Sequence, residues 1–232
     1  MKSRKKFSYV VVFLFIDILL CASLYFIIDA TNINVLKKEI KNIQTLDISI
    51  DRFNKKNKTI FKYKVVESTI KNFLDDYSKK MDKVYKIVSE EEFTKILSYD
   101  NYVEDGPDFI KSKEYIIDSK IRFNNTINDL ESDLEEDNIK ELIREKLDDK
   151  YYISLYDELV FSDELNKQYE NNRELLKEVR NKYNEVYDVS LEVLDFLSLY
   201  KDSWKLEDGE IKFSNNDLYN YYNSLISKIN TN

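Results

Sequence analysis

The sequence contains no histidine and one cysteine, Cys21, among its 232 residues. Histidine and cysteine supply most zinc ligands, the base of Ser-His-Asp triads and the thiolate of Cys-His dyads. One cysteine also excludes a disulfide within a single chain. We therefore predict that the protein is not an enzyme and that it binds neither a metal ion nor a cofactor.

Glycine occurs only twice and proline only once, at Gly106, Gly209 and Pro107. These residues mark most turns, so their scarcity indicates long uninterrupted helices and an all-α fold. An all-β or Rossmann-type fold would need many more of them. Neither glycine lies in a calcium-binding EF-hand, because the loop positions that need acidic ligands hold other residue types.

The charges are distributed unevenly along the chain. Four basic residues precede a long apolar run: Lys2, Arg4, Lys5 and Lys6. Beyond residue 30 the chain has 32 Lys and Arg but 42 Asp and Glu. An acidic domain repels phosphate backbones, so we predict that the protein does not bind nucleic acid. The acidic stretch at residues 131–138 is interpreted as a solvated helix end, as most charge runs are.

The apolar run from Phe7 to Ile28 has 22 residues. As a helix it would span about 33 Å, which matches the hydrocarbon core of a bilayer at about 30 Å. We predict an uncleaved signal anchor that crosses the cell membrane once, with residues 1–6 in the cytoplasm and the C-terminal part outside. Cleavage before Thr31 is the alternative, although Ile28-Asp29-Ala30 is a poor cleavage site.

An aspartate, Asp17, lies near the middle of this run. Its cost of about 2.5–3.5 kcal/mol is offset by the fifteen Leu, Ile, Phe and Val residues around it, so one interpretation is that it is simply tolerated. The other interpretation is a site of helix–helix interaction. Asp17 and Cys21 belong to a stripe that recurs every four residues and could contact a second copy of the chain or a partner membrane protein.

Beyond the run, apolar residues at three- and four-residue spacing predict helices over about 33–50, 59–88, 116–134 and 139–159. Ser89 and Glu92 have the spacing of a capping box, which predicts a short helix through about Ser98. The stretch at residues 99–108 holds a glycine and the proline and is predicted to be a loop.

The longest pattern predicts one helix from about Asp163 to Tyr200. Eleven positions alternate by four and three without interruption, which is the pattern of a coiled-coil seam. They are Leu165, Tyr169, Asn172, Leu176, Val179, Tyr183, Val186, Ser190, Val193, Leu197 and Tyr200.

The segment WKLEDGEIKF at 204–213 predicts a β-hairpin with Asp208-Gly209 as its two-residue turn. This register pairs Trp204 with Phe213 and Leu206 with Ile211 on one face. The opposite face pairs like charges, which is unfavourable. A last helix is predicted over 214–232, and we expect the apolar face of the hairpin to cover one end of the helices.

The sequence therefore predicts a basic tail (1–6), a transmembrane signal anchor (7–28), an elongated antiparallel helical bundle with coiled-coil-like packing (29–203), a β-hairpin (204–213) and a C-terminal helix (214–232). The expected function is a non-enzymatic scaffold or protein-interaction module of the cell envelope, in contact with the lipid bilayer. Two alternatives remain open: a ligand-sensing ectodomain that acts through a membrane partner, and a secreted effector or adhesin if the signal is cleaved.

Overall fold

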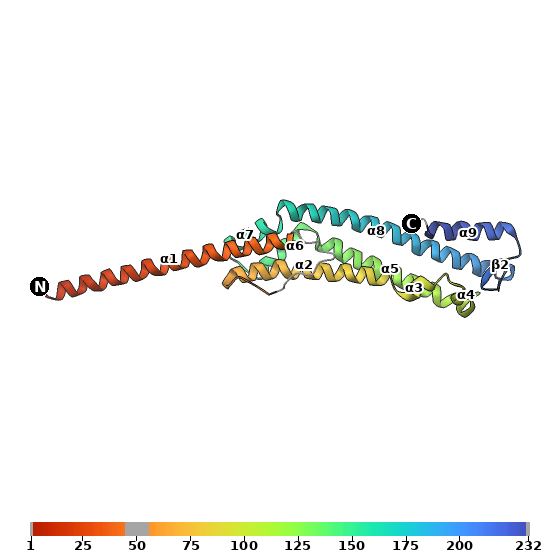
Figure 1. Ribbon diagram of the computed structural model, residues 1–232, viewed down its shortest axis with the longest axis horizontal. Coiled ribbons are helices and arrows are strands. Elements are labelled where there is room, and N and C mark those ends of the chain that lie inside the picture. Colours follow the sequence, from red (N-terminus) through yellow and green to blue (C-terminus); the bar gives the residue numbers. More distant parts are fainter. Residues whose placement is uncertain (1, 45–55, 231–232) are drawn as a thin grey trace. The chain divides into compact units, whose positions relative to one another are not determined.

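The fold is almost entirely helical, as predicted, with a small two-stranded antiparallel sheet near the C-terminus (Figure 1). The computed structural model describes the backbone of residues 2–44 and 56–230, and the side chains of residues 19, 20, 22–43 and 56–229. The helices are α1 (Lys2–Gln44), α2 (Phe61–Val88), α3 (Glu91–Lys95), α4 (Tyr99–Asp105), α5 (Ile110–Asp133), α6 (Glu136–Arg144), α7 (Lys150–Val160), α8 (Asp163–Leu199) and α9 (Asn216–Asn230). A 3₁₀ turn (Lys201–Ser203) leads into strands β1 (Trp204–Glu207) and β2 (Glu210–Phe213).

The chain folds into two compact units, each made of two separate stretches of sequence. Unit 1 comprises Met1–Asp75 and Lys140–Leu165, and unit 2 comprises Asp76–Ile139 and Asn166–Asn232. Helices α2, α6 and α8 contribute residues to both units. Each unit has a buried apolar core of its own.

In unit 1, α1 and α2 run in the same direction, which corrects the predicted antiparallel arrangement (Figure 1). Asp29 of α1 bonds Tyr63 of α2, and Glu39 further along α1 bonds Lys71 further along α2. Periodicity identifies helices but not their directions, and only short connections force neighbouring helices to be antiparallel. Here the connection runs from residue 45 to residue 60, which is long enough to allow parallel helices.

The stripe residues Leu46 and Ile50, predicted to extend the first helix, lie in 45–55, outside the described residues.

Helix α7 also runs parallel to α1 in unit 1. Its start lies near Asp29, because Tyr151 bonds Tyr63, whereas Glu158 near its end bonds Lys37. The three helices enclose an apolar core whose fully buried side chains are Leu36, Ile40, Val66, Ile70, Tyr156 and Val160. The N-terminal ends of α2 and α7 therefore lie at the same level of α1.

Unit 2 has the antiparallel packing that the sequence predicts. Lys80 of α2 bonds Asp133 at the end of α5 with 2.6 Å between nitrogen and oxygen, whereas Glu90 just beyond α2 pairs with Arg122. Along α5 and α8, Asn124 bonds Asn184 at 2.8 Å. The core side chains include Ile116, Phe123, Ile127 and Leu130 of α5 and Tyr187, Val193 and Leu197 of α8.

Helix α8 confirms the predicted long helix, ending one residue earlier than expected. The predicted seam is only partly buried: Asn172 and Val179 are half-buried and Tyr200 is exposed. Towards its C-terminal end α8 instead buries residues outside the seam, among them Tyr187, Val189, Leu194 and Phe196. The hairpin and α9 also pack on this end, so its apolar face is wider than a two-helix seam.

The region between α2 and α5 differs from the prediction in two ways. Residues 99–105 form helix α4 rather than a loop, and Ser98 caps it by accepting a hydrogen bond from the backbone N–H of Asn101 at 3.3 Å. The capping box is also wrong, because Ser89 donates to the carbonyl of Lys86 and α3 has no side-chain cap. Similarly, the stripe predicted over 139–159 is divided into α6 and α7.

The hairpin confirms the predicted register, with Trp204 opposite Phe213 and Leu206 opposite Ile211. Asp208 and Gly209 have φ angles of 56° and 81°, as a two-residue primed turn requires. Glu207 forms ion pairs with both Lys205 and Lys212, which offsets the pairing of like charges. As expected, the apolar face packs on the helices: the Trp204 indole N–H donates to the Leu197 carbonyl at 2.8 Å, and Phe213 contacts Phe196 and Tyr222.

In the part of the chain that the structure describes, no helix is both long enough and apolar enough to cross a membrane. The predicted transmembrane helix Phe7–Ile28 is thus without structural support and stays a prediction. Its residues belong to α1, but the side chains of residues 7–18 and 21 lie outside the described residues.

Candidate functional site

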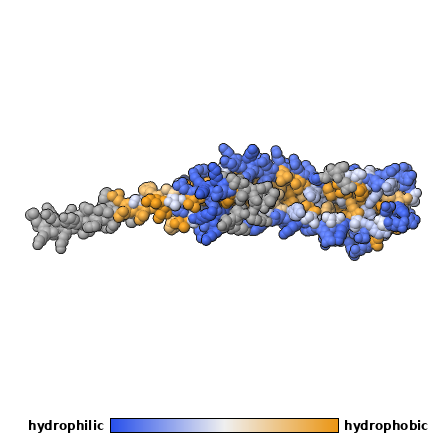
Figure 2. Space-filling model, in the orientation of Figure 1, coloured by the Kyte–Doolittle hydropathy of each residue, from blue (hydrophilic) through white to orange (hydrophobic). Residues whose placement is uncertain are grey.

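An apolar groove of about 830 Å³ opens in unit 1 where α1 passes the first turns of α2 and α7. We call it the Phe61 groove and define it by Leu24, Ile28, Phe61, Lys62, Val65 and Tyr152. Figure 2 shows hydrophobic residues gathered over the neighbouring described part of α1. There the exposed fractions of Leu19, Leu20 and the five residues Leu24–Ile28 range from 42% to 70%.

Phe61 has an unusual conformation at the start of α2. Its φ angle is 54°, in the left-handed region that glycine and asparagine favour, and its side chain is 72% exposed. Such a backbone costs about 1–3 kcal/mol and persists only where surrounding contacts hold it, most often at functional sites. Asn32 supplies one contact, because its side-chain oxygen accepts the Ile60 N–H at 3.0 Å.

Polar side chains border the groove. The Tyr63 hydroxyl donates to a carboxylate oxygen of Asp29, and it lies 3.3 Å from the hydroxyl of Tyr151. Burial, followed by these hydrogen bonds, raises the pKa of Tyr63 far above its usual value, so the phenol stays protonated. The Lys62 ammonium binds Asp149 at 2.8 Å and lies 5.5 Å from the centre of the Tyr152 ring. The border therefore combines aromatic rings with paired charges.

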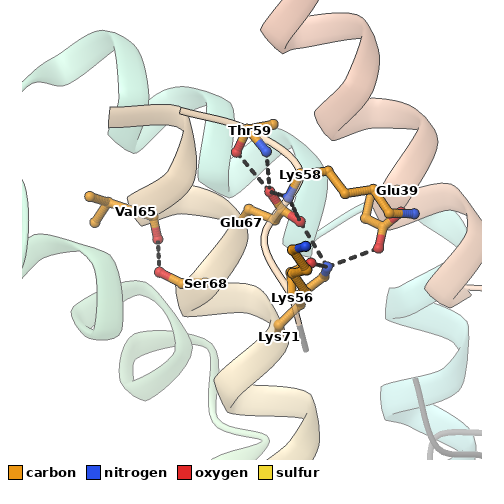
Figure 3. Close-up of polar contacts among 8 residues, drawn as sticks. All are labelled: Glu39, Lys56, Lys58, Thr59, Val65, Glu67, Ser68 and Lys71. Carbon is orange, nitrogen blue, oxygen red and sulfur yellow. Dashed lines mark hydrogen bonds and ion pairs between the residues drawn. The ribbon is translucent and has the colours of Figure 1, made fainter. Parts of the chain in front are cut away.

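A group of charged and polar side chains, all buried except Lys58, lies beneath the strained segment (Figure 3). We call it the Lys71 cluster; it consists of Glu39 from α1, Lys58 and Thr59 from the segment before α2, and Glu67 and Lys71 from α2. The Lys71 ammonium donates to Glu39 at 2.8 Å, to Glu67 at 2.7 Å and to the carbonyl of Lys56 at 3.0 Å. The side chains of Lys71 and Glu67 are only 1% and 0% exposed.

Glu67 holds the segment that precedes Phe61. Its carboxylate accepts the Thr59 N–H at 2.9 Å, the Thr59 hydroxyl at 2.7 Å and the Lys58 N–H at 2.9 Å. Lys58 in turn pairs with Glu39 of α1. The cluster thus anchors residues 56–59 to both helices, and Asn32 anchors Ile60. All donors of Lys71 are used within the protein, so the cluster positions the chain rather than offering a free reactive group.

These contacts make stability dependent on pH. Burial alone would raise the pKa of Glu67, but hydrogen bonds from Lys71 and Thr59 outweigh it and lower the pKa below 4.5. Burial would also raise the pKa of Glu39, but hydrogen bonds from Lys58 and Lys71 outweigh this effect and lower the pKa. Because the folded-state pKa lies below the unfolded one, this stabilisation is complete above about pH 4.5 and is lost as the pH falls through the folded-state pKa.

We expect the free energy of unfolding to decrease as the pH falls below about 4.5, and to decrease less steeply in Glu67→Gln, whose amide does not titrate. Urea unfolding followed by circular dichroism at each pH measures this slope. The control is the exposed Glu92→Gln, which should retain the parent slope. Equal slopes for Glu67→Gln and the parent protein would contradict the role assigned to Glu67.

A second uncovered surface lies in unit 2, between the end of α8 and the start of α9. This α8–α9 groove has a volume of about 440 Å³ and is lined by Phe196, Leu199 and Tyr221 together with the acidic residues Glu192, Asp195 and Asp217. Leu199 is among the most exposed large apolar side chains of the described residues. An apolar surface with an acidic border suits a partner segment that combines apolar and basic residues.

The predicted site residues Asp17 and Cys21 belong to α1, but their side chains lie outside the described residues, so their role in helix–helix contact stays a prediction. Among the described residues, no group of three or more Asp, Glu, His or Cys side chains is arranged to hold a metal ion. Comparison with known protein families, with characterised proteins and with solved structures finds no match to this chain.

Sequence reasoning did not find the Phe61 groove or the Lys71 cluster. A signal for the cluster was present: Glu67 and Lys71 are four residues apart and adjoin Val66 and Ile70, which belong to the apolar stripe of α2. A pair of opposite charges next to a stripe is also typical of an exposed helix face, so the sequence does not show whether it is buried. Its burial depends on Glu39, which comes from another helix and lies close because α1 and α2 are parallel.

Proposed function

We propose that the protein is a non-enzymatic scaffold or interaction module of the cell envelope, anchored in the cell membrane by residues 7–28. The basic residues before the run favour a cytoplasmic N-terminus, which leaves the rest of the chain outside the cytoplasm. Asp17 and Cys21 are proposed to meet a second copy or a partner membrane protein within the bilayer.

One observation carries this proposal: the apolar side chains at the described N-terminal part of α1 are open to the surroundings on every side of the helix. Leu24, Tyr25, Phe26, Ile27 and Ile28 are consecutive, and successive residues point about 100° apart, so together they encircle the axis. All five are exposed. A helix that is apolar all round is stable in an apolar medium, and an exposed patch of this kind is typical of contact with a membrane.

The interaction role is supported by the α8–α9 groove and by the acidic composition beyond residue 30. Apolar surfaces that a fold leaves uncovered are typical docking sites. The acidic border would steer a basic partner towards the surface, and charge steering raises association rates more than affinity. A scaffold needs such a surface and needs no catalytic group.

We expect the full-length protein to sediment with membranes and to resist extraction by alkaline carbonate. It should keep Met1 as its N-terminal residue, and it should be cleaved when trypsin is added to intact cells. The control is a chain that begins at Thr31, which should be recovered in the soluble fraction. A mature N-terminus at Thr31 with release into the medium would instead support a secreted effector or adhesin. Protection from trypsin in intact cells would contradict the proposed orientation.

A further inference from the structure

The Phe61 groove lies beside the residues predicted to form the outer end of the membrane span. Leu24 and Ile28 form one of its walls, and the predicted span ends at Ile28. Ile28 precedes Gln44, the last residue of α1, by about 24 Å of helix. The parallel packing of α1 and α2 places Phe61 at the level of Ile28 rather than at the level of Gln44.

The residues of this region are of the types that are enriched where a protein crosses the membrane surface. Phe61, Val65, Leu24 and Ile28 are apolar, and the neighbouring Tyr25, Tyr151 and Tyr152 combine an aromatic ring with a polar hydroxyl. Tyrosine gathers at the level of lipid headgroups, and lysine places its apolar stem in the membrane with its charge in water. Lys62 lies beside the Tyr152 ring, where its ammonium also pairs with Asp149.

The conformation of Phe61 fits a contact with an apolar medium rather than with the protein core. Its left-handed backbone is held by Asn32 through Ile60 and by Glu67 through Thr59, and its ring nevertheless remains 72% exposed. The buried contacts thus hold in place a side chain that the protein itself does not cover. Ile60 beside it is also exposed, which extends the uncovered apolar surface.

We propose that lipids of the outer leaflet occupy the Phe61 groove, with the Phe61 ring among the acyl chains and with Lys62 and Tyr152 at the headgroups. This inference rests on the proposed membrane anchor. The bilayer is the occupant that the geometry favours, because the groove is continuous along α1 with the predicted span. The protein then has a second point of attachment to the same membrane, which restricts the tilt of unit 1 on the bilayer surface.

The test uses full-length protein with a single tryptophan, made by Phe61→Trp combined with Trp204→Phe, in vesicles of equal parts phosphatidylcholine and phosphatidylglycerol. Phosphatidylcholine brominated near the headgroup end of its acyl chains serves as a quencher. We expect blue-shifted emission that loses most of its intensity with the brominated lipid. The matched control is Lys41→Trp in the same background, because Lys41 is exposed and lies on α1 about 20 Å beyond the end of the predicted span. Its emission should be unshifted and unquenched.

Three outcomes would overturn the inference and are distinguishable. If the protein floats with the vesicles but position 61 is quenched no more than position 41, the anchor stands and the lipid contact is wrong. Blue-shifted emission without quenching would likewise mean that protein, such as a second copy, covers the groove. If the protein does not float with the vesicles, the proposed anchor itself fails. Val65→Trp, on the α2 wall of the groove and outside the predicted span, repeats the measurement should Phe61→Trp not fold, as judged by circular dichroism.

Discussion

Lys71→Met is expected to lower the free energy of unfolding by about 3–5 kcal/mol, because it removes the cation that is shared by two buried carboxylates. Methionine has nearly the length of lysine, so the change creates little empty space. Glu67 then keeps only its bonds to Lys58 and Thr59, and Glu39 keeps only Lys58. Removing one partner of a buried ion pair is costly chiefly because the remaining charge stays buried without compensation.

Urea unfolding followed by far-ultraviolet circular dichroism measures this loss. The matched control is Lys64→Met on the same helix, where the exposed side chain should change stability by less than about 0.5 kcal/mol. The double variant Lys71→Met with Glu67→Gln should lose less than the sum of the two single losses, since the second change removes the charge that the first leaves uncompensated. Additive losses would show that the two residues do not act as one cluster.

The helices of this protein could be predicted from sequence because so few residues interrupt the periodicity. Helix α8 follows the predicted bounds closely, and the hairpin register followed from Asp208-Gly209 and the alternation around it. Both are decided by local chemistry: apolar spacing for the helix, and positive φ at two turn residues for the hairpin. Helix α4 was missed because Gly106 and Pro107 were interpreted as breaking the whole stretch, whereas they follow its end.

The candidate site could not be predicted because it depends on which helices meet. Asn32, Phe61 and Tyr152 are far apart in sequence, and they come together only because α2 and α7 both start beside the same part of α1. An antiparallel arrangement would have placed Phe61 near Gln44, at the C-terminal end of α1. The strain at Phe61 is equally invisible in sequence, since Lys58-Thr59-Ile60 contains no turn residue that would indicate a left-handed conformation. It arises from the contacts with Glu67 and Asn32.

The core of unit 2 is built around the aromatic ring of Phe123. Phe123 is fully buried on α5, and its ring lies 5.6 Å from that of Tyr183 and 5.9 Å from that of Tyr187. Tyr187 also contacts Phe93, at 4.9 Å between ring centres. Removal of the central ring would deprive both tyrosines of their contacts at once and leave a cavity that helices cannot readily close.

We therefore expect Phe123→Ala to lower the free energy of unfolding by about 3–5 kcal/mol, and Phe123→Leu to cost less because it fills most of the space. Trp204, the only tryptophan, stacks on Phe109 in unit 2, so its fluorescence in urea reports this loss. Ile121→Ala on the same helix is the control: it is 53% exposed and should change stability by less than about 0.5 kcal/mol. Equal effects of the two alanine substitutions would contradict the burial of Phe123, and with it the packing of α5 against α8.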